Sequence, residues 1–193
     1  MKFTHLHVHS HYSILDGMSK VPDLIEKCMK NGMTSMALTD HGNMFGIKDL
    51  KDSANSFNSK PKKKVSECKE NIAKEKAIIE SDEKSDEEKE KAKARLADLE
   101  AELPKLEEKL NNFVPFKPII GIEAYCARRT LYDHDKNYKF FSAERGKEII
   151  VDRSGWHLIL LAKNKKGYQN LCKLASIAYI DGFYDRPRID KNV

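Results

Sequence analysis

Four histidines stand within seven positions near the start of the chain, in the stretch HLHVHSHYS. His5, His7 and His9 occupy alternate positions, so they share one face if the stretch is a β-strand. Imidazoles gathered on a buried face need polar partners or a metal ion, because an unpaired buried polar group is costly. An H-x-H pair at the end of a strand brings two nitrogen ligands to one cation, an arrangement that suits zinc or manganese.

Carboxylates and further imidazoles accompany the other apolar runs of the sequence. Asp16 follows the histidine stretch, Asp40 and His41 end the run TSMALTD, Glu123 lies in GIEAY, and His157 lies in GWHLILL. Such a mixed set suits a cluster of divalent ions in which one carboxylate bridges two of them. Each residue has a simpler alternative: Asp40 could cap a turn, and His157 could be a hydrogen-bonded core histidine. Their joint occurrence favours a metal site.

The elements that must position these side chains alternate between strand and helix. Strands are predicted over 3–9, 34–40, 117–127 and 156–164, and helices over 19–32 and 165–183. A further helix is predicted to start within 41–54, after a glycine-rich turn. This order predicts βαβ units and a parallel sheet or barrel. In such folds the functional groups gather at the carboxyl ends of the strands. His157 fits this rule less easily, because it stands early in its strand.

A charged segment, residues 52–112, interrupts this alternation. It has no Tyr or Trp, and its apolar residues recur at heptad spacing, which predicts an inserted antiparallel hairpin of two helices. The stretch SDEKSDEE between them predicts a turn followed by a helix cap. Pro104 predicts a kink or break near Leu103, because proline inside a helix costs roughly 3 kcal/mol or more. A solvated spacer and a partner-docking arm remain equal alternatives for the hairpin.

The overall composition describes a chain with room for one good-sized core. The chain has 193 residues and a net charge of +5. The charged segment holds 14 Lys/Arg against 16 Asp/Glu, so the excess of basic residues lies outside it. That excess is compatible with a phosphate-bearing partner. The four cysteines form no CxxC pair, no apolar run has the length of a membrane span, and the first residues do not form an apolar signal sequence. We expect a cytoplasmic protein that does not associate with a membrane.

Five stretches together resemble one known family. They are HLHVHSHYSILDG, TDHGNMFG, KPIIGIEAY, HLILLAKNKKGYQNL and GFYDRPRID. They look like the PHP (polymerase and histidinol phosphatase) domain at the N-terminus of bacterial DNA polymerase III alpha subunits, over residues 1–51 and 116–191. Histidinol phosphatases share the H-x-H and D-H elements but are not expected to show the last stretch or AKNKKGYQNL.

The resemblance implies an α/β fold, the N-terminal portion of a distorted (β/α)7 barrel formed by residues 1–51 and 113–193, with residues 52–112 as a helical insertion. It also implies a centre of up to three divalent ions of zinc, manganese or iron. Its metal ligands would be His7, His9, Asp16, His41, Glu123 and His157. Asp40 would orient His41, and His5 would line the barrel. A further Asp-x-His motif of the family would lie beyond Val193, so the chain alone is expected to be an inactive N-terminal piece.

The same resemblance implies a role in DNA replication, within a DNA-directed DNA polymerase, which is a nucleotidyltransferase. The partners would be the primer 3′ end of DNA, the rest of the polymerase and other replisome subunits. For the site itself the leading hypothesis is a metal-dependent phosphodiesterase, a proofreading 3′→5′ exonuclease. A structural module that docks a proofreading subunit and a stand-alone phosphomonoesterase of the histidinol phosphatase type are the alternatives. Arg128, Arg129, Arg186 and Arg188 are candidates to hold the phosphate backbone, or else to pair with nearby carboxylates.

Overall fold

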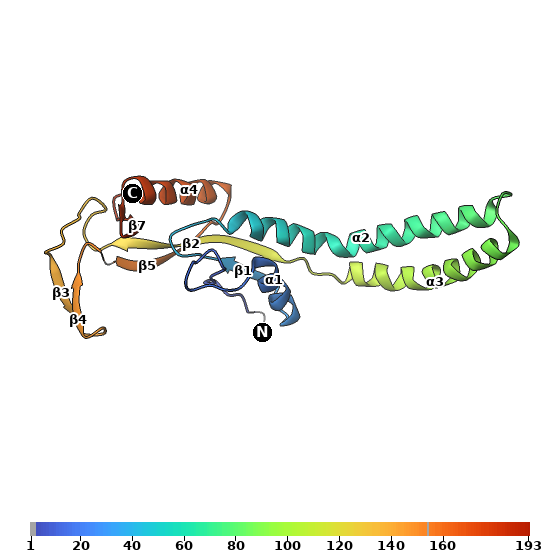
Figure 1. The fold of residues 1–193 in the computed structure, drawn as a ribbon, viewed down its shortest axis with the longest axis horizontal. Helices are drawn as coiled ribbons and strands as arrows, with labels where there is room; N and C mark the ends of the chain where they lie inside the picture. Colours follow the sequence, from blue (N-terminus) through green and yellow to red (C-terminus); the bar gives the residue numbers. More distant parts are fainter. Residues whose placement is uncertain (1–2, 154) are drawn as a thin grey trace. The chain divides into compact units, whose positions relative to one another are not determined.

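The computed structural model describes residues 3–153 and 155–193, whose contacts divide the chain into two compact units. The sheet unit comprises Met1–Ala54 and Phe116–Val193, and the hairpin unit comprises Asn55–Pro115. Figure 1 shows the elements of both units along the chain. Within the described residues we find no helix that combines the length and the apolar character needed to cross a membrane.

Strand β2 is the centre of the sheet unit. The elements of this unit are α1 (Val21–Lys30), β1 (Ser35–Leu38), the start of α2 (Ile47–Glu80), β2 (Lys117–Ala127), β3 (Lys139–Ser142), β4 (Lys147–Ile150), β5 (Gly155–Leu161), α4 (Lys165–Ile180), β6 (Phe183–Tyr184) and β7 (Arg186–Ile189). β2 pairs in parallel with β1 and β7 and antiparallel with β5. The result is a mixed α/β arrangement. Within the described residues β1, β2, β5, β6 and β7 form one sheet, and β3 and β4 form a second. The strand pairs close neither sheet on itself, so the closed barrel stays a prediction.

Strand β5 is antiparallel to β2, which corrects the all-parallel expectation. The two strands pair from Gly121 opposite Leu161 to Ala127 opposite Gly155, and Figure 1 shows them side by side. A parallel neighbour requires a long crossover, usually a helix, whereas an antiparallel neighbour does not. The described residues between β2 and β5 hold the β3–β4 hairpin in place of a helix. The first residues of β5 therefore meet the last residues of β2.

The histidine stretch runs beside β1 but is not itself a strand, contrary to expectation. His5 forms an isolated parallel bridge with Met36, and the carbonyl groups of His5 and Val8 accept hydrogen bonds from the amides of Ala37 and Thr39. The amide of Val8 donates to the Thr39 hydroxyl, at 3.1 Å, rather than to a backbone carbonyl. This side-chain bond takes the place of a ladder bond and leaves the segment extended but only partly paired.

Helix α4 packs on one side of the sheet unit. It lies against β2 and β7, as Figure 1 also shows. A small apolar core of Ala124, Ala178 and Ile189 forms there, with Leu160 and Leu174 packed against it. Because side chains alternate along a strand, burying Ala124 against α4 turns the neighbouring Glu123 to the opposite face of β2.

The hairpin unit consists of most of α2 and of α3 (Asp86–Asn111). Helix α2 begins at Ile47, after the glycine-rich turn as expected, and continues without interruption to Glu80, so the two helices expected over this range are one. Helix α3 likewise continues through Pro104, so of the predicted kink or break the break is wrong. The side chain of Pro104 is exposed.

The two helices of the hairpin unit lie antiparallel and side by side (Figure 1). Lys69 pairs with Glu107, and Lys76 pairs with Glu100, at 2.8 and 3.0 Å between the charged atoms. Ser85 begins α3 with a capping box, in the stretch where the sequence predicted a turn and a cap.

Candidate metal centre

Glu123 is a fully buried carboxylate in the middle of β2. Its backbone is fixed by the segment that follows β1: the amide of Glu123 donates to the Asp40 carbonyl, and the amide of Gly42 donates to the Glu123 carbonyl. Neither carboxylate oxygen accepts a hydrogen bond from a described residue. A buried carboxylate in this condition needs a compensating partner, since its removal from water is otherwise uncompensated.

Four imidazoles surround the Glu123 carboxylate. The Nε2 atoms of His9 and His7 lie 2.9 and 3.6 Å from Oε2, and the Nδ1 atom of His41 lies 3.1 Å from the same oxygen. His157 contacts the other oxygen, Oε1, through Nδ1. Two groups of possible ligands result, His7–His9–Glu123 and His41–Glu123–His157, each with its ligand atoms within 4.8 Å of one another. Glu123 belongs to both, as a carboxylate that bridges two ions would.

Two of the histidines are held with one ring nitrogen toward Glu123. His7 and His9 use Nδ1 to contact the hydroxyls of Thr39 (2.8 Å) and Ser13 (2.9 Å), which fixes each ring with Nε2 toward Glu123. Burial is the larger cause that lowers the pKa of His9 below its ordinary value, and the electrostatic effect of the nearby His41 is the second. A lowered pKa favours the neutral imidazole that binds metal ions. The donor set therefore fits borderline divalent cations such as zinc, manganese and iron.

Asp16 reaches the same centre from an exposed loop. Its carboxylate lies 2.8 Å from Nε2 of His41, whose Nδ1 faces Glu123. Gly17 closes this loop against the backbone, because a Cβ atom at this position would stand 1.9 Å from the carbonyl oxygen of Ser10. Only glycine fits there without moving the turn that carries Asp16.

Asp40 organises the loop through serines. Its buried carboxylate accepts hydrogen bonds from the amide and hydroxyl of Ser10, at 2.7 and 2.9 Å, and from the hydroxyl of Ser13, at 2.7 Å. The Ser13 oxygen in turn contacts His9 and accepts the amide of His41. Among the described residues no bond joins Asp40 to the His41 ring, so any orienting effect of Asp40 passes through Ser13 and the backbone.

The antiparallel register of β5 explains how His157 joins the others. His157 lies opposite Tyr125, two residues after Glu123 in β2. Tyr125 stacks on His41 and meets His157 edge to face, with ring centroids 6.1 and 5.1 Å apart. The guanidinium of Arg186 lies 4.7 Å from the centroid of the Tyr125 ring. Burial raises the pKa of Tyr125, which keeps its phenol protonated.

The four candidate arginines have different surroundings. Arg186 is half-buried and contacts the ring of Tyr125, which in turn contacts two histidines of the cluster. Arg128 lies over the rings of Phe140 and Trp156, with its guanidinium 4.6 Å from each. Arg129 forms a two-pronged ion pair with Asp152, and this pair lowers the pKa of the carboxylate.

Arg188 is 1% exposed and donates to four backbone carbonyls. These belong to Leu131, Asp133, Asp152 and Gly182. Its side chain holds the long β2–β5 connection to β7. Of the four arginines, Arg186 is therefore the one that the structure brings to the histidine cluster.

Sequence reasoning did not single out Ser13, Thr39 and Tyr125, which fix the ligand rings. Ser13 lies in HLHVHSHYS and Thr39 lies in TSMALTD, two stretches in which only the histidines and the aspartate were considered as site residues. Polar residues next to expected ligands were the available signal, since ligating histidines usually use their second nitrogen for a hydrogen bond.

The chain is similar to a known domain family and to several curated proteins. The PHP domain family matches residues 5–193. The DNA polymerase III subunit alpha of Borreliella burgdorferi is 37% identical over 191 residues, which cover 99% of this chain and 11% of the relative. The subunits of the same name from Campylobacter jejuni and Thermus aquaticus are 33% and 30% identical, and each match covers 100% of this chain and 10% of the relative. The chain thus spans about a tenth of the length of these curated relatives.

Proposed function

Because this chain belongs to the PHP domain family, we propose that its histidine and carboxylate cluster is the site of a metal-dependent phosphodiesterase that removes nucleotides from a DNA 3′ end. The names of its relatives support DNA as the substrate. We extend the proposal to the longer polypeptide: a DNA polymerase III alpha subunit in which this domain proofreads the primer end, beside the rest of the polymerase and other replisome subunits.

The single observation that carries the proposal is the buried Glu123 carboxylate with four imidazoles around it. A structural salt bridge would need one charged histidine, not four. The proposed ligands are His7, His9, Asp16, His41, Glu123 and His157, with Glu123 bridging two ions. Divalent ions held there would lower the pKa of a water molecule and stabilise the negative charge that develops during phosphodiester cleavage.

The remaining residues of the site have binding and positioning roles in this proposal. The Arg186 guanidinium, held over Tyr125, gives the site a permanent positive charge for a phosphate oxygen. Tyr125 limits the freedom of the His41 and His157 rings. Asp40 holds Ser13, and through it His9, in place.

The test is a nuclease assay on the full-length polypeptide that carries this chain. A single-stranded DNA labelled at its 5′ end is incubated with zinc, manganese or iron, and shortening from the 3′ end is followed on a denaturing gel. We expect shortening by the wild type, a loss of at least a hundredfold in Glu123→Gln, and no change in the matched control Glu102→Gln, an exposed residue of α3. The same rate in Glu123→Gln and wild type would contradict the proposal. Cleavage of p-nitrophenyl phosphate without DNA shortening would contradict the choice of substrate.

A further inference from the structure

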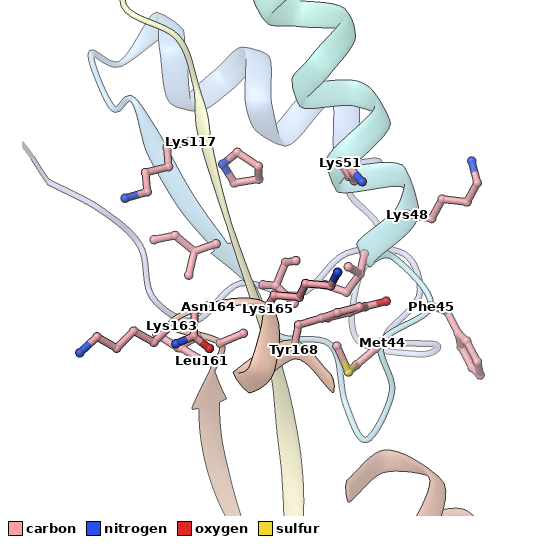
Figure 2. Close-up of a pocket in the computed structure, with 15 residues that line it drawn as sticks. Met44, Phe45, Lys48, Lys51, Lys117, Leu161, Lys163, Asn164, Lys165 and Tyr168 are labelled. Atoms are coloured by element: carbon pink, nitrogen blue, oxygen red, sulfur yellow. The ribbon is translucent and has the colours of Figure 1, made fainter. Parts of the chain in front are cut away.

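We propose that a lysine-rich groove of the sheet unit, separate from the histidine cluster, binds single-stranded DNA through its phosphates and bases. The groove has a volume of about 970 Å³. It lies where β2 begins, β5 ends, and helices α2 and α4 start (Figure 2). None of the six proposed metal ligands lines it.

The lining of the groove is strongly positive. Its charged residues are Lys48, Lys51, Lys117, Lys163 and Lys165, and the lining contains no acidic residue. In Figure 2, Lys117 and Lys163 lie on one side, Lys48 and Lys51 lie on the other, and Lys165 lies between them. Among the described residues only Lys48 of these five forms an ion pair, with the exposed Asp52. Four ammonium groups are therefore available to a polyanion.

Two aromatic rings accompany the lysines. Phe45 is 66% exposed and Tyr168 is 39% exposed, and both line the groove. Exposed rings beside a basic groove are the combination that binds single strands, because each base can stack on a ring while the lysines contact the phosphates. Paired bases are already stacked within a duplex, so this combination favours a single strand over a duplex.

An acidic peptide is the competing occupant, since much of the lining of the groove is apolar. Its apolar lining residues include Ile47, Pro118, Ile119, Ile120, Leu161 and Ala162. The lysines favour DNA because they stand on both sides of the groove and between them. A strand lying in the groove would therefore meet several point charges, which suits its regularly repeated phosphates.

The groove and the histidine cluster share two strands. Ile120 and Glu123 are three residues apart in β2, and Leu161 and His157 are four residues apart in β5. At about 3.3 Å per residue, the groove begins roughly 10–13 Å along the strands from the cluster. A strand held in the groove would therefore lie close to the proposed nuclease site, although the binding itself does not depend on nuclease activity.

Lysine footprinting on the full-length polypeptide tests the inference residue by residue. The protein is acetylated briefly with and without saturating oligo(dT), with EDTA present to prevent cleavage, and each lysine is quantified by mass spectrometry. We expect at least threefold protection of Lys51, Lys117, Lys163 and Lys165. The exposed run 62–64 of α2 is the internal control and should be unprotected. Equal modification of the groove lysines with and without DNA would overturn the proposal.

Substitution gives a second, independent readout. The triple variant Lys51→Ala, Lys163→Ala, Lys165→Ala should lose about two units of the slope of log affinity for oligo(dT) against log salt, since each single-strand phosphate contact contributes about 0.7. Alanines at positions 62–64 remove the same charge and should leave the slope unchanged. Tyr168→Ala should weaken binding at least fivefold. If the triple variant instead loses affinity for an acidic peptide such as polyglutamate and keeps its slope with oligo(dT), the occupant is a peptide and the proposal is wrong.

Discussion

Replacing Arg188 with alanine should destabilise the sheet unit, because this guanidinium is the buried donor that holds the β2–β5 connection to β7. Its donors reach the carbonyls of Leu131, Asp133, Asp152 and Gly182. The guanidinium is removed from water, since Arg188 is 1% exposed, and this burial lowers its pKa. Removing the side chain leaves four carbonyls without this donor and opens a space beneath the connection.

The magnitude follows from the bonds that are lost. A hydrogen bond from a charged donor contributes roughly 1.5–3 kcal/mol, so four independent bonds would give about 6–12 kcal/mol. Loop carbonyls can regain water, however, and breaking a buried charged network typically costs about 3–5 kcal/mol. We therefore expect Arg188→Ala to lower the free energy of unfolding by about 3–5 kcal/mol, or the Tm by roughly 6–20 °C for a chain of this size. Arg188→Lys keeps the charge but has fewer donors, so its loss should be intermediate.

Urea unfolding followed by tryptophan fluorescence measures this loss. Trp156 is the single tryptophan and lies in β5, so its signal reports the sheet unit. The control is Arg145→Ala, an exposed residue of the β3–β4 hairpin, which should change stability by less than about 0.5 kcal/mol. A loss below about 1 kcal/mol in Arg188→Ala would refute the structural role and return Arg188 to the candidates for phosphate binding.

Three other changes have defined outcomes. Replacing both His7 and His9 with alanine should lower metal content and Tm together, because bound metal stabilises the native state; unchanged content by elemental analysis would remove both residues from the site. Deleting residues 55–115 and joining the ends with a short loop should leave a cooperative unfolding transition, measured by circular dichroism, since the contacts already separate this unit. The Arg129 guanidinium lowers the pKa of Asp152 in the folded state. The stability that this carboxylate contributes is therefore complete above the ordinary aspartate pKa near 4, and it is lost as the pH falls through the lowered pKa. Asp152→Asn should therefore reduce the drop in Tm on acidification, and an identical drop would contradict this assignment.

Local patterns predicted the position of several elements because their causes are local. The continuous apolar run KPIIGIEAYCA predicted β2 with its observed bounds, and the capping residues around Ser85 predicted the start of α3. The helix from Lys165 was predicted from the apolar residues along one of its sides, and two of these, Leu171 and Ala178, are buried.

Pairing and direction depend on long-range contacts and could not be predicted in the same way. The antiparallel β5 follows from a connection that holds a hairpin in place of a helix, and the irregular residues around it gave no clear signal. The same register removes the difficulty with His157, which stands early in its strand yet lies opposite Tyr125. The histidine stretch alternates like a strand, but a side chain, the Thr39 hydroxyl, takes one of its backbone bonds.

The candidate ligands were predictable as residue types, whereas their supporting contacts were not. The structure brings His7, His9, His41 and His157 to Glu123, and it brings Asp16 to His41. The positions of Arg129 and Arg188 depended on partners as far as 57 residues away in sequence. Sequence alone left phosphate binding and ion pairing equally open for these arginines.

The metal content of the purified full-length polypeptide tests the central claim most directly. Elemental analysis without added metal should find two or three equivalents of zinc, manganese or iron per chain, because two ligand groups share Glu123. Glu123→Ala should bring the content close to zero, whereas Glu102→Ala on the surface of α3 should leave it unchanged. Metal-free wild-type protein that stays metal-free after incubation with these ions, or full metal content in Glu123→Ala, would contradict the account.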